Sequence, residues 1–351
     1  MEYLIPNYFD KFKCKCGECR NTCCVGWTVS MSLEEWFKLK NIDCDDEFRE
    51  KIDRGIYTFI NPSADRYAYI KKDYYGDCIF HGQDGLCEMH KKFGEDKIAN
   101  VCRMYPKSIK NSPDYEKSCS NSCEAVIELL INEIDKITFN NYLENNKIEI
   151  DCINIIQEDE SLINKFKKIG KYLNVLDNTY EDTNLSINSI LKVIYDYILL
   201  YKDKHNSIDE YIEIMENLNL KYLIESNKFD YLSYKQNLYA KVPNYDNYIS
   251  KLLANHILFS NFPYKDNNDK KLPLYSLCGV YSFVTFIVAV ILNYKYDVEN
   301  DLNKQNIDKN LFVDILTKVF RLCEHSQFPV KFGLYLESIY SNNDILNLIK
   351  L

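Results

Sequence analysis

Glycine and proline are scarce in this sequence. Among 351 residues there are only 10 Gly and 8 Pro, too few for the many tight turns of a β-sandwich. Basic residues are also fewer than acidic ones: 43 Lys and Arg against 52 Asp and Glu, which gives a net charge of -9. Without a basic face, nucleic acid is not expected as the main partner. The hydrophobic share of 46% excludes a disordered or a fibrous chain.

The patterns of a secretory signal and of a Rossmann-type fold are also missing. The opening residues, MEYLIPNYFDKFK, lack a basic start, a long apolar run and a small-residue cleavage site, so we expect no secretory signal and a cytoplasmic protein. There is no G-x-G-x-x-G loop and no βαβ alternation, which excludes a Rossmann-type fold. One long apolar run, Leu272 to Leu292, stands alone and contains Pro273, Ser276 and Gly279. We interpret it as a buried central helix and expect no membrane insertion.

Cysteine, by contrast, is abundant and unevenly distributed. Eleven of the 14 cysteines fall within residues 1–123. Clustered thiols in a reducing compartment are typical of metal or redox chemistry, with structural disulfides as the alternative. Four thiolates complete a tetrahedral zinc site or hold a four-iron cluster, and cysteine ligation suits both. We therefore expect thiols from two groups to converge on a metal: Cys14, Cys16, Cys19, Cys23 and Cys24, and then Cys78, Cys87, Cys102, Cys119 and Cys123.

Local patterns around these cysteines refine the expectation. Cys102 precedes Arg103 and Cys123 is expected in the first turn of a helix, and both surroundings favour a thiolate. Cys87 and His90 have a zinc-like spacing, although we interpret His90 as a surface polar residue. The C-x3-C-x2-C pattern of radical enzymes fails, because Gly26 stands at its third position. The isolated cysteines are predicted to be buried apolar residues: Cys44, Cys152, Cys278 and Cys323.

Helical periodicity dominates the chain beyond residue 124. Ser32 and Glu35 have the spacing of a capping box, and Asn121 and Glu124 repeat it ahead of the run AVIELLINEIDKI. The sequence predicts a mainly α fold, in which a cysteine-rich, loop-containing metal-binding module (1–125) precedes an α-helical domain (126–351). The helical segments expected in that domain are 158–174, 185–202, 207–224, 229–239, 246–260, 273–295, 309–325 and 332–349.

The order and spacing of these motifs resemble the flagellin lysine N-methylase family. Its F-x-C-x4-C-x3-C-C-x2-W pattern begins here at Phe12, and its C-x-F-x5-GLC-x-I-(Q/H) pattern begins at Cys78. Three shorter patterns follow. C-x2-YP begins at Cys102, a segment similar to S-C-P-E-A begins at Ser122, and a segment similar to R-x-x-E-H begins at Arg321. Departures are two extra thiols, no proline after the last cysteine, and lysine after the YP pair. The resemblance implies eight metal-ligand positions: Cys14, Cys19, Cys23, Cys24, Cys78, Cys87, Cys102 and Cys123.

The resemblance further implies S-adenosylmethionine-dependent methylation of lysines on flagellin or a similar protein, with zinc or a 4Fe-4S cluster as the bound metal. Methyl transfer requires a neutral amine, whereas the reference pKa of lysine is about 10.4, so the site must desolvate the ammonium or supply a base. Glu324 and His325 are the candidates for proton removal. Tyr105 is the candidate for orienting the amine, and Arg103 for binding the carboxylate of S-adenosylmethionine.

Each of these assignments has an alternative in which the residue has only a structural role. Glu324 and His325 also fit a polar pair at a helix end, Tyr105 fits a packing residue before proline, and Arg103 fits a solvated helix surface. Two other functions use the same features: a metal-sequestering or iron–sulfur binding protein whose thiols are themselves the function, and a maturase that modifies another peptide on this scaffold.

Overall fold

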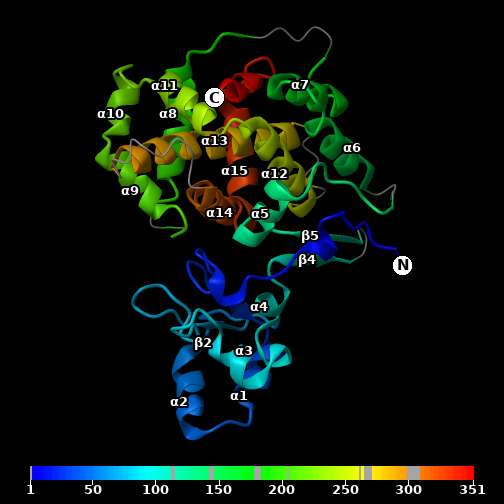
Figure 1. The fold of residues 1–351 in the computed structure, drawn as a ribbon, viewed down its shortest axis with the longest axis vertical. Coiled ribbons are helices and arrows are strands. Elements are labelled where there is room, and N and C mark those ends of the chain that lie inside the picture. The colour runs from blue at the N-terminus through cyan, green and yellow to red at the C-terminus, as the bar shows by residue number, and fades with distance from the viewer. Residues whose placement is uncertain are drawn as a thin grey trace. The chain divides into compact units, whose positions relative to one another are not determined.

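The chain folds into two compact units, Lys13–Ser108 and Met1–Phe12 together with Ile109–Leu351 (Figure 1). Helical elements outnumber strands in both, and greatly so in the larger unit, which confirms the predicted mainly α class. The computed structural model describes residues 2–111, 115–141, 146–177, 183–202, 204, 206–260, 262–264, 271–298 and 309–351.

The larger unit is built from helices, preceded by a small two-stranded sheet. In that sheet β4 (Lys107–Lys110) pairs with β5 (Glu116–Cys119). The described helices of this unit are η1 (Phe9–Lys11), α5 (Glu124–Asn132), α6 (Lys147–Ile156), α7 (Leu162–Tyr172), α8 (Ile187–Leu199), α9 (Asp209–Asn217), α10 (Leu220–Glu225), α11 (Tyr231–Lys241), α12 (Tyr245–Phe259), α13 (Leu272–Val298), α14 (Lys309–His325), α15 (Phe328–Ile339) and η5 (Ile345–Lys350).

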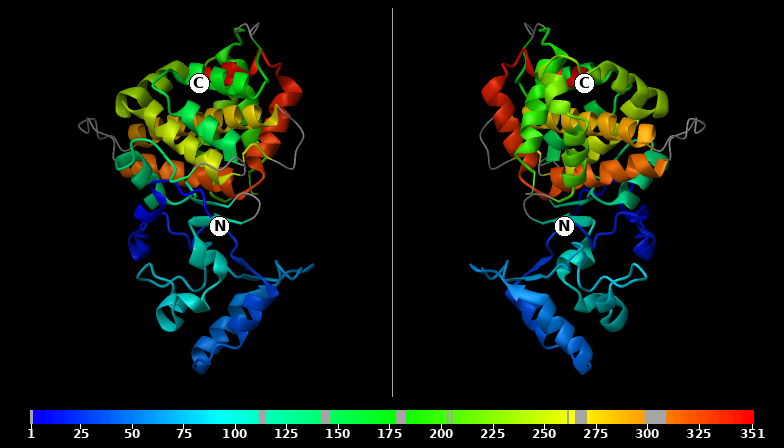
Figure 2. Two further views of the ribbon diagram at one scale, coloured as in Figure 1. Left: turned by 90° about the vertical axis from the view of Figure 1, so that its right-hand side faces the viewer. Right: turned by 90° about the vertical axis from the view of Figure 1, so that its left-hand side faces the viewer.

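Helix α13 forms the centre of the larger unit. Figures 1 and 2 show it passing between the other helices, and it packs against α11, α14, α15 and η5. Among the described residues, its stretch Leu272–Tyr296 is the one long and apolar enough to cross a membrane, yet the apolar 18-residue window within it is entirely buried inside the protein. The interpretation of this run as a buried core helix is confirmed.

Two glycines allow α13 and α15 to approach closely. A Cβ atom at Gly333 of α15 would lie 2.2 Å from Ser276 Oγ and 3.0 Å from Ser276 N. A Cβ atom at Gly279 of α13 would lie 2.9 Å from the ring of Phe332. Neither position has room for a larger side chain unless the helices separate, so the helix contact depends on glycine at both.

The smaller unit combines short helices, long loops and a three-stranded antiparallel sheet in the order β1-β3-β2. Its core includes Met31, Ile52, Ala68, Phe80 and Met89. Helices α1 and α2 run side by side in Figure 2. The elements are η2 (Cys16–Glu18), β1 (Ser30–Met31), α1 (Leu33–Lys40), α2 (Asp46–Gly55), β2 (Ile56–Thr58), β3 (Ala68–Ile70), α3 (Glu88–Phe93), η3 (Glu95–Lys97) and α4 (Asn100–Met104).

One of the two predicted capping boxes forms. Ser32 Oγ accepts a hydrogen bond from Glu35 N at 3.2 Å, and Glu35 Oε2 accepts one from Ser32 N at 2.8 Å. The second box was wrong: Cys123 caps α5 without a side-chain hydrogen bond. Asn121 Oδ1, the atom that would accept in a capping box, instead accepts a hydrogen bond from Asn255 Nδ2. Asn121 Nδ2 donates to the buried carboxylate of Glu324.

Some element boundaries differ from the predicted ones. The segment predicted as one helix over 207–224 is two, α9 and α10, because Asn219 adopts a left-handed φ of 54°. The boundary predicted at residue 125 falls inside α5, whose Val126, Ile127 and Leu130 are buried and which packs against α12 and α14. The segment preceding Lys13 belongs to the same unit.

The substitution Gly333→Ala is expected to lower the free energy of unfolding by about 1–3 kcal/mol, because the new methyl group overpacks the contact between α13 and α15. Urea denaturation followed by circular dichroism measures the change. Lys331→Ala, at an exposed position of the same helix, is the control and should stay within about 0.5 kcal/mol of the parent. Equal stability of all three proteins would contradict the close packing.

Candidate functional site

Four motif cysteines of the smaller unit lie around one region of its core. Cys24 O accepts a hydrogen bond from Cys78 N at 2.8 Å, which joins the two cysteine groups of the sequence. Cys87 caps α3 and Cys102 lies on α4. The side chains of Cys78, Cys87 and Cys102 pack against the same hydrophobic cluster. These backbone and packing contacts bring the four cysteines into one part of the smaller unit, and their convergence on a metal stays a prediction.

The four thiols interact electrostatically. Burial raises the pKa of Cys102 far above its ordinary value, and the charges of Cys78, Cys87 and Cys24 raise it further. Burial likewise raises the pKa of Cys78 to about 12 and that of Cys87, with Cys24 adding to both shifts. Thiolates gathered in this way repel one another, and a bound cation would relieve that repulsion.

Cys24 differs from its neighbours. A hydrogen bond from Cys23, helped by Thr22 and by the charge of His81, outweighs burial and lowers the pKa of Cys24 to about 6. Near neutral pH this residue is therefore largely a thiolate. Of the four, Cys24 is the one best prepared to bind a metal or to react with an electrophile.

The donor set fits a zinc or iron–sulfur centre in its chemistry and in the number of its thiols. None of the 14 cysteines is paired in a disulfide in this structure. Within the described ranges, however, no three His, Cys, Asp or Glu side chains are arranged as ligands of one metal ion. The thiols would have to draw closer to share an ion, so metal ligation stays a prediction.

The other predicted ligands have different surroundings. Cys14 and Cys23 are exposed and Cys19 is half-buried, all on the loops around η2. Cys14 Sγ accepts a hydrogen bond from the backbone N of the extra cysteine, Cys16, at 3.3 Å. Cys123 is buried in the larger unit, where it caps α5. The four isolated cysteines were predicted to be buried. Cys152, Cys278 and Cys323 are buried, whereas Cys44 is half-buried.

In the larger unit, the carboxylate of Glu324 is enclosed by hydrogen-bond donors. Its side chain, at the end of α14, is 0% exposed. Glu324 Oε2 accepts bonds from Ser120 Oγ at 2.6 Å and Asn121 N at 2.7 Å. Oε1 accepts bonds from Asn121 Nδ2 at 2.9 Å and His256 Nδ1 at 3.2 Å. Four donors satisfy a buried charge, so Glu324 holds the chain before α5 against α12 and α14.

His325 extends this network to the surface. Its Nε2 atom lies 2.7 Å from Ser122 Oγ and 3.1 Å from Ser120 Oγ, and the residue is exposed. The segment that resembles S-C-P-E-A and the segment that resembles R-x-x-E-H therefore meet, although they are about 200 positions apart. Unlike Glu324, His325 combines access to solvent with two hydroxyl groups that could relay a proton.

Sequence reasoning missed the residues that complete the network. Asn255 Nδ2 donates to Asn121 Oδ1 at 2.7 Å and to Cys119 O at 2.8 Å, and Asn255 also bonds Tyr8. His256, beside it on α12, is buried. Both lie in the run Tyr248 to Phe262, a weaker part of the same family resemblance, but no role was predicted for either residue.

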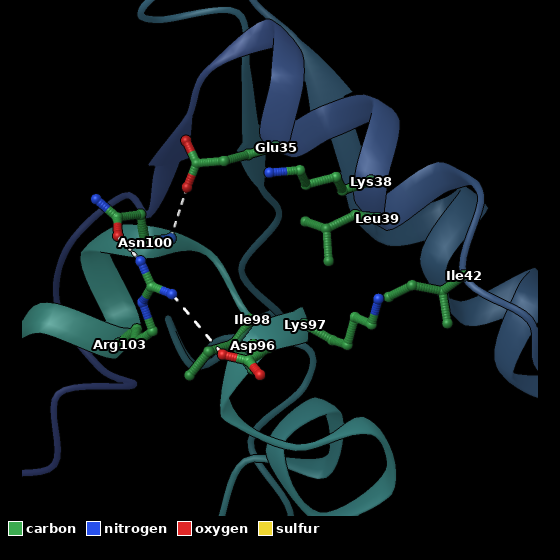
Figure 3. Close-up of a pocket in the computed structure, with 9 residues that line it drawn as sticks. All are labelled: Glu35, Lys38, Leu39, Ile42, Asp96, Lys97, Ile98, Asn100 and Arg103. Carbon is green, nitrogen blue, oxygen red and sulfur yellow. Dashed lines mark hydrogen bonds and ion pairs between the residues drawn. The ribbon is translucent and has the colours of Figure 1, made fainter.

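Tyr105 and Arg103 lie in the smaller unit. The Tyr105 ring packs edge-on against Trp27, with centroids 5.0 Å apart. Arg103 donates to Asn100 Oδ1 at 2.7 Å and reaches Asp96 at 3.9 Å. Figure 3 shows Arg103 at the rim of a pocket that is also lined by Glu35.

The volume of this pocket, about 70 Å³, is far below the roughly 300–1,000 Å³ of small-molecule sites. It does not by itself enclose S-adenosylmethionine. The cofactor-binding role of Arg103 stays a prediction, as does the orienting role of Tyr105.

The chain is similar to two proteins named lysine-N-methylase, from Salmonella typhimurium and Salmonella choleraesuis. Each match is 21% identical over 211 residues, which is 58% of this chain and 48% of the relative. The flagellar biosynthetic protein FliU of Salmonella muenchen is 23% identical over 134 residues, covering 37% of this chain and 77% of that protein. This chain thus aligns with about half the length of the lysine-N-methylases. No family model and no solved structure matches it.

The substitution Glu324→Ala is expected to lower the free energy of unfolding by about 2–5 kcal/mol, because it leaves four buried donors without their acceptor. Urea denaturation measures the loss. Glu213→Ala, which removes an exposed carboxylate from α9, should change stability by less than about 0.5 kcal/mol. Equal effects of the two substitutions would show that the network contributes nothing.

Alkylation of the metal-free protein by iodoacetamide should distinguish Cys24 from Cys78. A thiol reacts as its thiolate, so the rate at Cys24 should rise as the pH passes through about 6 and then level off. Cys78, with a pKa raised to about 12, should stay unreactive at neutral pH. Peptide mass spectrometry measures both rates, with Cys24→Ser as the control. Equal rates at neutral pH would contradict the assigned environments.

Proposed function

We propose that this chain is a protein-lysine N-methyltransferase that uses S-adenosylmethionine to methylate a flagellin-like protein in the cytoplasm. The observation that carries the proposal is the similarity to lysine-N-methylases over 211 residues. Two features of the fold support it. Thiols of the cysteine motif gather around one core, and two further motif segments join in one hydrogen-bond network.

The proposed chemistry assigns different tasks to Glu324 and His325. The lysine nitrogen attacks the methyl carbon as the carbon–sulfur bond of the sulfonium breaks, which releases S-adenosylhomocysteine, and the amine must give up a proton. His325 Nε2 takes that proton, directly or through Ser122 Oγ at 2.7 Å. Glu324 already accepts four hydrogen bonds. It is therefore a positioning residue that holds the serine segment in place.

The proposed metal centre involves Cys24, Cys78, Cys87 and Cys102. A bound zinc ion or iron–sulfur cluster would supply positive charge to these thiols and tie together loops that contain little regular structure. The remaining motif cysteines, Cys14, Cys19, Cys23 and Cys123, are kept as further candidate ligands. Tyr105 is proposed to orient the amine, and Arg103 to bind the carboxylate of S-adenosylmethionine.

Incubation with monomeric flagellin and methyl-labelled S-adenosylmethionine tests the proposal. We expect label on lysine side chains, mapped by peptide mass spectrometry. The variant His325→Gln should lower kcat by about 100-fold or more, the usual contribution of a general base. Glu213→Gln, exposed on α9, is the control and should keep full activity.

Two outcomes would contradict the proposal. A metal-loaded protein that transfers no methyl group would point to metal sequestration, and methylation of a non-lysine group would point to the peptide-modifying alternative. Full activity of His325→Gln would overturn the proton-acceptor role but leave the methyltransferase proposal intact.

A further inference from the structure

Three aromatic rings form a row on the outer face of the three-stranded sheet in the smaller unit. Tyr57 of β2 is paired with Tyr69 of β3, and their rings stack with centroids 6.1 Å apart. Phe59, which follows β2, has its ring 4.9 Å from that of Tyr69. Ala68 and Ile70 of β3 are buried in the core. Because successive side chains of a strand point to opposite faces, the three rings lie on the face turned away from the core.

These rings remain accessible to a partner. The side chain of Tyr57 is 44% exposed, and those of Phe59 and Tyr69 are half-buried. Ile60, the next residue after Phe59, is 98% exposed in the loop between β2 and β3. Single exposed apolar side chains are common in soluble proteins, whereas neighbouring ones are typical of an interaction site.

Two cations lie on the row of rings without a carboxylate partner. Arg66 Cζ is 4.1 Å from the centre of the Phe59 ring, and Lys71 Nζ is 5.8 Å from the centre of the Tyr57 ring. Both cations are exposed, and neither side chain forms an ion pair or a hydrogen bond with any described residue. A guanidinium over a ring face still offers its N–H fork to a bidentate carboxylate.

Other basic side chains of this unit do have a carboxylate at ion-pair distance: Lys38, Lys40, Lys51, Arg54, Lys91, Lys92 and Arg103. Positions 13 to 108 contain 16 basic and 16 acidic residues, so the unit has no net positive charge to attract a nucleic acid. The charge of Arg66 and Lys71, beside the rings, is nevertheless uncompensated. Charge complementarity therefore favours a partner that carries a few carboxylates together with apolar groups.

We call this surface the aromatic face; it consists of Tyr57, Phe59, Arg66, Tyr69 and Lys71. We propose that the aromatic face docks an acidic segment of a protein partner. Carboxylates of the segment pair with the two cations, and its apolar or aromatic side chains cover the rings. The inference goes beyond the proposed function and does not depend on it, because docking needs neither methyl transfer nor a metal. For a protein-modifying enzyme, such a surface recognises the substrate away from the reacting lysine.

Fluorescence anisotropy with the full-length chain and a labelled random copolymer of glutamate and tyrosine tests the proposal. We expect saturable binding by the parent protein. The double variant Arg66→Gln/Lys71→Gln should bind about 5-fold or more weakly, because it loses two ion pairs. Tyr57→Ala, which removes the most exposed ring of the row, should weaken binding as well. Added NaCl should weaken binding by the parent more than binding by the double variant.

The matched control is the double variant Lys38→Gln/Arg54→Gln. It removes the same two charges from the same unit, but Lys38 and Arg54 are already paired with Glu34 and Glu50. We therefore expect it to bind the copolymer like the parent protein. Circular dichroism checks that each variant is folded, and labelled polylysine, which has the wrong charge, should not bind to the parent.

Three results would overturn the docking proposal. The first is a parent protein that does not bind the copolymer, and the second is equal weakening in the two double variants. The third is tighter binding of labelled oligothymidylate that is lost in Arg66→Gln/Lys71→Gln, which would make the face a nucleic-acid site. Methyl transfer to flagellin is measured separately. A parent that methylates flagellin but does not bind the copolymer overturns docking alone, and one that binds but does not methylate overturns the proposed function alone.

Discussion

A carboxylate buried away from water must be surrounded by donors, and this constraint organises the larger unit. Glu324 meets it with two donors from Asn121, one from Ser120 and one from His256. These donors come from the segment before α5 and from α12, so one charge joins three parts of the chain. The exposed His325 is then fixed beside two serine hydroxyls. The arrangement that supports the proposed proton transfer thus follows from the solvation of a single buried anion.

The constraint in the smaller unit is a different one, because its thiols lie near one another. Its half-buried thiols are close enough to raise one another's pKa, and its regular elements are short. The proposed metal would stabilise this small, loop-rich unit, because binding free energy adds to folding free energy. Cys24, already largely ionised near neutral pH, is the thiol of this unit best prepared to bind a cation.

Features that repeat along the chain could be predicted from the sequence. The helical pattern gave the mainly α fold and most of the helices of the larger unit, and Ser32 with Glu35 marked the start of α1. Asn121 and Glu124 have the same spacing, but tertiary contacts with Asn255 and Glu324 occupy the Asn121 side chain there. The cysteine spacings indicated a metal-binding motif. They could not show which thiols of the first group face the second.

By itself, the sequence determined that the run from Leu272 must lie inside a helical core, since it is apolar on every side. It also determined that thiols are concentrated in the first 123 residues, because composition and periodicity are local properties. Only the tertiary structure decided which polar groups meet. Asn121 and Glu324 are 203 positions apart, and so are Ser122 and His325. Such contacts depend on how helices and loops pack, and no local pattern of residues encodes that packing.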